Sequence, residues 1–167
     1  METVYIGLGS NLDDPRAQVL AALHALAALP RSRVLRHSRL YRSAPWGRRD
    51  QPEFINAAAM LQTTLAPREL LDELLAIERN AGRARDGTRW GPRVLDLDVL
   101  LYGSRVVDES GLRVPHPHLA ERAFVLLPLA EIAPEVQVPG LARVGALLAR
   151  IDASACVALE PDPALAE

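Results

Sequence analysis

Lysine is absent from this chain, and all nineteen basic residues are arginine. A Walker A phosphate-binding loop requires a lysine, as do a protein-kinase active site and Schiff-base chemistry. The absence of lysine therefore excludes these three classes. Any phosphate group that the chain binds must be held by arginine side chains, backbone amides or a metal ion.

Cysteine, aromatic residues and long apolar runs are also scarce. The single cysteine, Cys156, cannot form an intramolecular disulfide and suits a reducing compartment. No apolar run reaches the eighteen residues typical of a membrane span, and no secretory signal pattern is found. The net charge of −2 gives no general attraction to nucleic acids or anionic membranes. We therefore expect a cytoplasmic protein with no nucleic-acid or membrane partner.

The length of 167 residues predicts one compact domain. We place that domain at residues 1–160 and expect a loose tail at residues 161–167. A monomer is expected.

A short predicted strand that carries two carboxylates follows an arginine-rich stretch, residues 83–93. Asp96 and Asp98 alternate with apolar residues, so they share one face about 6–7 Å apart. The opposite face comprises Leu95, Leu97, Val99 and Leu101. Two carboxylates so close repel each other and require a neighbouring cation. Paired carboxylates beside guanidinium groups are typical of a magnesium-triphosphate site.

Hydrophobic periodicity predicts the remaining elements. Strands are expected at residues 3–8, 34–41, 53–64 and 95–102, with a small hairpin piece near residues 106–107. Residues 7–11 are expected to form a tight turn, with Asp13 or Asp14 capping the next helix. Helices are expected from Pro15 to Pro30, from Pro67 to near Gly82, and at residues 118–133 and 141–150. The second and third strands have no helix between them and should pair antiparallel. This order favours an α+β sandwich of ferredoxin-like type over a doubly wound parallel sheet.

Several of these segments resemble one known family. Arg89-Trp90-Gly91-Pro92-Arg93 followed by Leu95-Asp96-Leu97-Asp98 is similar to the signature of the 6-hydroxymethyl-7,8-dihydropterin pyrophosphokinases. Further motifs in the family's order are found at residues 6–12, 41–43, 50–52, 54–58, 82–83, 114–116 and 131–135. The resemblance extends to about residue 150.

The resemblance implies transfer of diphosphate from ATP to the hydroxymethyl group of 6-hydroxymethyl-7,8-dihydropterin. The products would be AMP and the pterin diphosphate, in folate biosynthesis. The resemblance also implies a ferredoxin-like fold and two Mg²⁺ ions bound by Asp96 and Asp98. Together with Arg83 and Arg93, these two residues form the expected catalytic set.

Two groups of binding residues carry over from the family. The positions expected to contact ATP are Glu78, Arg83, Arg85, Trp90, Arg93, His116 and Arg122. The positions expected to contact the pterin are Ser43, Ala44, Trp46, Phe54, Asn56, Trp90, Asp96 and Phe124. In this resemblance Phe54 and Phe124 sandwich the ring and Asn56 reads its edge. The chain departs from the common family pattern around the nucleotide at Leu75, Gly111, Arg113 and Pro117.

Two other functions remain as alternatives. A D-x-D nucleotidyltransferase or phosphohydrolase would also use two metal ions, but would release pyrophosphate or phosphate. A ferredoxin-like RNA-binding module is a second alternative. It would stack bases on sheet aromatics, and aromatic residues make up only 4% of this chain.

Overall fold

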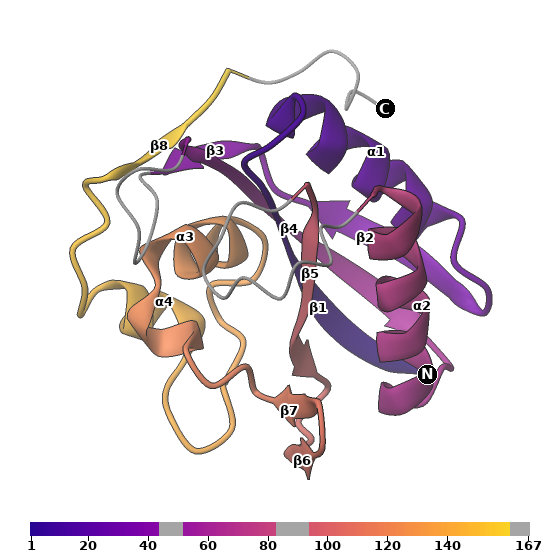
Figure 1. The fold of residues 1–167 in the computed structure, drawn as a ribbon. Coiled ribbons are helices and arrows are strands. Elements are labelled where there is room, and N and C mark those ends of the chain that lie inside the picture. Colours follow the sequence, from indigo (N-terminus) through magenta and orange to yellow (C-terminus); the bar gives the residue numbers. More distant parts are fainter. Residues whose placement is uncertain (44–51, 83–93, 161–167) are drawn as a thin grey trace.

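The computed structural model describes residues 1–43, 52–82 and 94–160 (Figure 1). Its main sheet contains six antiparallel strands in the order β5-β1-β4-β3-β8, and β2 also pairs with β4. The strands are β1 (Glu2–Ser10), β2 (Ser32–His37), β3 (Tyr41–Ser43), β4 (Phe54–Thr63), β5 (Asp96–Tyr102) and β8 (Cys156–Ala158). A separate hairpin is formed by β6 (Val107–Glu109) and β7 (Leu112–Val114).

Helices cover both faces of this sheet (Figure 1). Helices α1 (Pro15–Ala27) and α2 (Pro67–Asn80) pack on one face and form the larger apolar core with it. The 3₁₀ helix η1 (Leu119–Glu121) and helices α3 (Ala123–Ile132) and α4 (Val144–Leu148) pack on the other face. Strand order and layering confirm the expected α+β, ferredoxin-like class. No helix in the described ranges is long and apolar enough to cross a membrane.

Local signals explain where the two long helices begin. The side chain of Asp14 accepts a hydrogen bond from the backbone N–H of Ala17 at 3.3 Å, as an N-cap residue does. Helix α2 begins with Pro67, and Glu69 accepts the N–H of Ala66 at 2.8 Å. The predicted helix starts are therefore confirmed.

A β-bulge in β5 corrects one expectation. Tyr5 pairs with Leu101 and Ile6 pairs with Val99, so Leu100 is an extra residue in the ladder. The bulge turns both Leu100 and Leu101 toward α3 and α4. The prediction that Leu101 shares a face with Leu95, Leu97 and Val99 was wrong, because strict alternation ends at the bulge.

Two further boundaries differ from the prediction. Strand β1 continues through Ser10, so residues 7–10 are extended and do not form a turn. The strand expected at residues 34–41 is interrupted at Ser38, whose hydroxyl accepts the N–H of Ala58 at 2.9 Å. Strand β8 was not predicted, because its three residues carry no periodic pattern.

Candidate active site

Asp96 and Asp98 lie on the sheet face opposite the α1 and α2 core. Their intervening and following neighbours Leu97 and Val99 are buried in that core, so both carboxylates point to the other side. On the adjacent strand β1, Gly9 pairs with Asp96 and Gly7 pairs with Asp98. The two carboxylates therefore stand beside positions that carry no side chain.

Glu78, on helix α2, hydrogen-bonds to the strand that carries the two aspartates. Its side chain is only 2% exposed, and its carboxylate accepts the backbone N–H of Leu97 at 2.7 Å. Leu97 stands between the two aspartates, so the bond fixes the backbone that carries them. The family resemblance places Glu78 among the expected ATP contacts, and the structure shows it buried and bonded to β5.

His116 faces Asp98 from the segment after β7. Its backbone N–H donates to the Leu100 carbonyl at 3.1 Å, which ties the segment to β5. Burial, followed by the nearby charges of Arg122 and His118, lowers the pKa of the imidazole to about 4. The ring is therefore neutral near pH 7, and its 3.9 Å contact with Asp98 is not an ion pair.

The tautomer of His116 follows from its neighbours. The backbone N–H of His118 points at Nδ1 of His116 at 3.3 Å, so Nδ1 acts as an acceptor. In a neutral imidazole the proton then resides on Nε2. This N–H is on the side of Asp98 Oδ2, where it can donate to a ligand oxygen.

Arg122 supplies positive charge near the two aspartates. Burial lowers the pKa of its guanidinium, while the negative charges of Asp98 and Asp96 raise it. The guanidinium therefore interacts electrostatically with both carboxylates. Its Cζ atom also lies 5.6 Å from the centroid of the Phe124 ring at the start of α3.

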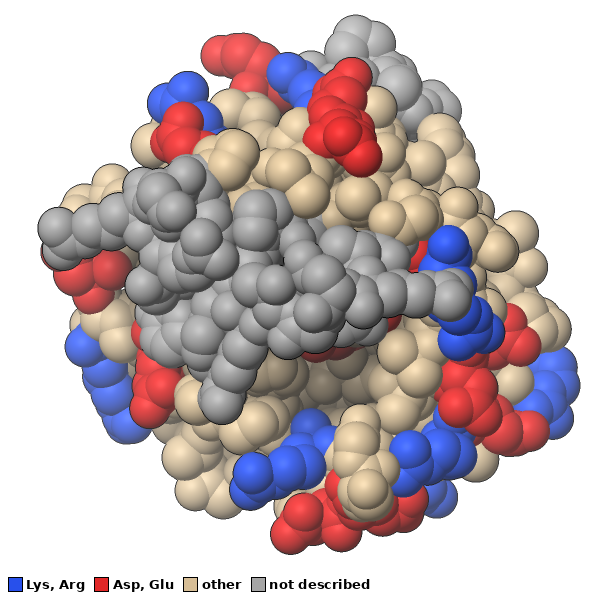
Figure 2. Space-filling model, in the orientation of Figure 1, with Lys and Arg blue, Asp and Glu red and all other residues tan. Residues whose placement is uncertain are grey.

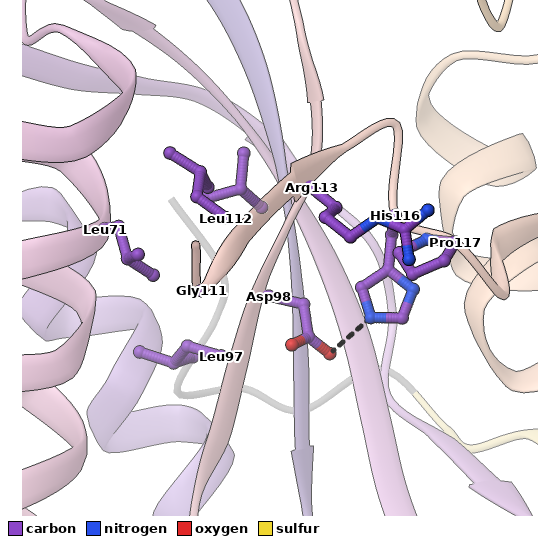
Figure 3. A pocket seen from close by; sticks show the side chains of 9 residues that line it. Leu71, Leu97, Asp98, Gly111, Leu112, Arg113, His116 and Pro117 are labelled. Carbon is purple, nitrogen blue, oxygen red and sulfur yellow. Dashed lines mark ion pairs between the residues drawn. The ribbon is translucent and has the colours of Figure 1, made fainter. Parts of the chain in front are cut away.

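A cleft of about 270 Å³ opens beside Asp98 (Figure 3). Leucine side chains from α2, β5 and β7 form one wall, and Figure 3 shows Arg113, His116 and Pro117 on the other side. The labelled lining residues are Leu71, Leu97, Asp98, Gly111, Leu112, Arg113, His116 and Pro117. Three of the four positions that depart from the family pattern therefore line this cleft.

Asn56 and Ser43 lie on the same sheet face, across β1 from the aspartates. Asn56 pairs with Gly9, and its Nδ2 donates to Ser43 Oγ at 2.9 Å. Phe54 begins β4 beside Ser43, two residues before Asn56. Because strands are about 4.8 Å apart, the amide and Asp96 are separated by roughly two strand spacings. A planar ligand could span this distance.

Ser10 and Asn11 are functional candidates that the sequence did not single out. Both are buried, and Ser10 Oγ donates to the carbonyl of Val94, two residues before the acidic strand. Asn11 Nδ2 donates at 3.3 Å to the carbonyl of Pro52, two residues before β4. The two side chains anchor the starts of both strands that carry the site. Both residues belong to the motif at residues 6–12. The sequence predicted a tight turn there and gave no indication of hydrogen-bond partners for their side chains.

Six of the expected site residues lie outside the described residues. These are Ala44, Trp46, Arg83, Arg85, Trp90 and Arg93. The structure brings the other expected residues to one face of the sheet and to the segments flanking it, except Glu78, which lies on α2 at the opposite face. Among the described residues on the face shown in Figure 2, acidic and basic side chains are interspersed.

The carboxylates of Asp96 and Asp98 fit a magnesium ion whose coordination is completed by oxygen atoms of a bound ligand. Carboxylate oxygens are its preferred protein ligands, and it usually takes only one or two of them together with substrate phosphates. Among residues 1–43, 52–82 and 94–160, no group of three or more His, Cys, Asp or Glu side chains could hold a metal ion. Asp96 and Asp98 would therefore need phosphate oxygens or water to complete a metal shell.

The fold and the site together define an α+β protein of ferredoxin-like type with an acidic, phosphate-compatible face on its sheet. A family model described as 7,8-dihydro-6-hydroxymethylpterin-pyrophosphokinase matches residues 5–134. The chain belongs to this family.

Relatives and solved structures agree with this assignment. A 2-amino-4-hydroxy-6-hydroxymethyldihydropteridine pyrophosphokinase of Pseudomonas aeruginosa is 52% identical over 149 residues, covering 89% of this chain and 91% of that protein. One of Methylorubrum extorquens is 47% identical, covering 92% of this chain and 96% of that protein. A crystal structure of Plasmodium falciparum HPPK-DHPS superposes with a TM-score of 0.72 at 14% identity and supports the fold. That match covers 89% of this chain and 43% of the Plasmodium chain.

Proposed function

We propose that this chain transfers diphosphate from ATP to the hydroxymethyl oxygen of 6-hydroxymethyl-7,8-dihydropterin, giving AMP and the pterin diphosphate in folate biosynthesis. Membership of the family supports this reaction, and the relatives are named as pyrophosphokinases of hydroxymethyldihydropteridine. The observation that carries the proposal is the placement of Asp96 and Asp98 beside Arg122 and His116, on the sheet face that also presents Asn56.

Asp96 and Asp98 would hold two Mg²⁺ ions. Their carboxylates share one face, and the bond from Leu97 to Glu78 fixes the strand between them. Magnesium at this position would neutralise and orient the phosphate oxygens of ATP. Phosphoryl transfer depends mainly on positioning and charge neutralisation, so the site needs no strong general base.

The nucleotide would occupy the cleft beside Asp98. The apolar walls from Leu71, Leu112 and Pro117 suit an adenine ring, with phosphates directed toward the aspartates. Arg122 and the Nε2–H of neutral His116 would donate to phosphate oxygens there. Arg83 and Arg93 would stabilise the transferring phosphates, and Arg85, Trp90 and Glu78 complete the proposed ATP contacts.

The pterin would lie on the Asn56 side of the same face. An amide has both a donor and an acceptor, which suits the edge of a polar heterocycle. Phe54 is the first residue of β4 and Phe124 lies in the first turn of α3, and both would stack on the ring. The remaining proposed contacts come from Ser43, Ala44, Trp46, Trp90 and Asp96.

Product analysis tests the reaction directly. Purified protein is incubated with ATP, Mg²⁺ and 6-hydroxymethyl-7,8-dihydropterin, and nucleotides and pterins are separated by chromatography. We expect equal amounts of AMP and pterin diphosphate. Free pyrophosphate with a nucleotidylated product, or phosphate alone, would instead indicate the nucleotidyltransferase or phosphohydrolase alternative.

We further propose a monomer formed by one domain over residues 1–160 and working in the cytoplasm. The lone cysteine suits a reducing compartment. Sedimentation at micromolar concentration should give a mass near 18.2 kDa. A mass near twice that value would contradict the monomer.

A further inference from the structure

Gly9 lies at the centre of the proposed substrate face. On one side it pairs with Asn56 of β4, and on the other with Asp96 of β5. It therefore separates the amide proposed to read the pterin from a carboxylate proposed to hold metal.

Among the described residues, a side chain at Gly9 would collide with Asn56. A Cβ atom built there would lie 2.9 Å from Asn56 Oδ1, closer than Cβ atoms occur in real structures. The next nearest atoms are Asn56 Cγ and the Ile55 carbonyl oxygen, both at 4.0 Å. None of the three nearest atoms belongs to Asp96, so the conflict concerns the amide and not the metal ligand.

Asn56 cannot move aside without a cost. Its side chain is 5% exposed, and its Nδ2 is bound to Ser43 Oγ. Rotating the amide away from Gly9 would break this buried hydrogen bond. Ser43 is itself held in β3 between Phe54 of β4 and Cys156 of β8.

We propose that Gly9 is a positioning residue for substrate recognition, because its missing side chain lets the Asn56 amide keep the single orientation that Ser43 defines. This inference rests on the proposed function, since it assigns Asn56 to the pterin. Glycine is required here for close approach of a side chain and not for backbone freedom.

Gly9→Ala tests the proposal in a binding titration. The probe is 6-hydroxymethylpterin, added to protein saturated with Mg²⁺ and a non-hydrolysable ATP analogue. We expect the pterin Kd to rise by about tenfold, the effect of one lost hydrogen bond. The Kd of the magnesium-bound ATP analogue, measured without pterin, should stay within about twofold.

Gly7→Ala is the matched control, on the same strand and face. A Cβ atom there would meet a terminal carbon of Leu100 at 3.2 Å, a tighter contact than usual but one that involves no polar group of the proposed substrate face. We expect its pterin Kd to stay within about threefold of the original. An equal loss in both variants would overturn the proposal, because it would show general damage to β1.

A double-mutant cycle covers the case in which Gly9→Ala folds poorly. In an Asn56→Ala background the added methyl group has room, so Gly9→Ala should lower Tm much less there than in the original chain. Equal Tm losses in both backgrounds would contradict the steric argument. If the original chain binds no pterin, the proposed function fails. If it binds pterin and Gly9→Ala binds it equally well, only this inference fails.

Discussion

Asp96 and Asp98 occupy positions where uncharged residues would suit the strand better. They share one face of β5, and like charges at that spacing repel each other. Arg122 offsets part of this repulsion. The proposed magnesium ions would offset the rest of this repulsion.

Replacing one carboxylate should separate activity from stability. In Asp98→Asn the shape is kept while a metal ligand and a negative charge are lost. We expect turnover to fall at least a hundredfold, about 2.7 kcal/mol in barrier height. The Tm should remain equal or rise slightly, because repulsion with Asp96 is removed. Near-normal turnover in a coupled AMP assay would remove Asp98 from the metal site.

Glu78 is expected to act on the site through the backbone. Glu78→Ala leaves the Leu97 N–H without its acceptor in a buried position, which costs about 1–3 kcal/mol of unfolding free energy. We also expect a lower kcat, because the strand between the aspartates loses its brace. Denaturant unfolding and steady-state kinetics measure the two effects.

Asp72→Ala is the matched control for Glu78→Ala, since Asp72 is an exposed acid on the same helix. Its unfolding free energy and kcat should stay near the original values. The account of Glu78 would be wrong if both variants behaved alike.

Some of these side chains could be predicted from the sequence and others could not. The aspartates were predictable because alternation assigns a strand residue to a face from local spacing alone. Ser10 and Asn11 were not, because their partners Val94 and Pro52 are 84 and 41 residues away. The need for glycine at position 9 could not be predicted either, because it arises from a side chain on another strand, that of Asn56.

Strand β3 and helix α3 are joined by a polar link next to the site. The Tyr41 hydroxyl donates to Glu131, which also accepts the backbone N–H of Arg39 at 3.0 Å. Burial, followed by the hydrogen bond to Glu131 and its negative charge, raises the pKa of Tyr41 from 10 to about 12. The link fixes the strand that carries Ser43.

This raised pKa predicts a loss of stability in alkaline solution. Above pH 10 the unfolded chain ionises Tyr41 while the folded chain does not, so the stabilisation present below pH 10 is lost as pH rises toward 12. Tyr41→Phe should remove part of that loss and lower the unfolding free energy at pH 7 by about 1 kcal/mol. Urea unfolding at pH 7, 10 and 11.5 measures both. An unchanged alkaline slope in Tyr41→Phe would contradict this role.

Predictions of whole elements succeeded where a periodic apolar pattern extends over many consecutive residues. Helices α1 and α2 each extend over at least thirteen residues with capping signals, and their predicted starts were correct. The bulge at Leu100 and the three-residue strand β8 escaped prediction. Both depend on pairing with distant strands, which local periodicity does not encode.

In the molecule as a whole, one face of the sheet is covered by helices. The other face is partly covered by helices and partly carries the proposed site residues. Helices α1 and α2 cover the first face. On the other face, Tyr5, Ala58 and Leu100 pack against α3 and α4, while Asn56, Asp96 and Asp98 lie toward the other end of the same strands. The ferredoxin-like order thus places an amide and two carboxylates on one face of the sheet.

Calorimetric titration of ATP in the presence and absence of Mg²⁺ tests the central claim most directly. With the original chain, Mg²⁺ should tighten the binding of a non-hydrolysable ATP analogue by at least tenfold. With an Asp96→Asn/Asp98→Asn double variant of unchanged Tm, that gain should vanish. Equal affinity with and without Mg²⁺ in the original chain, or an undiminished gain in the variant, would contradict the assignment of these aspartates.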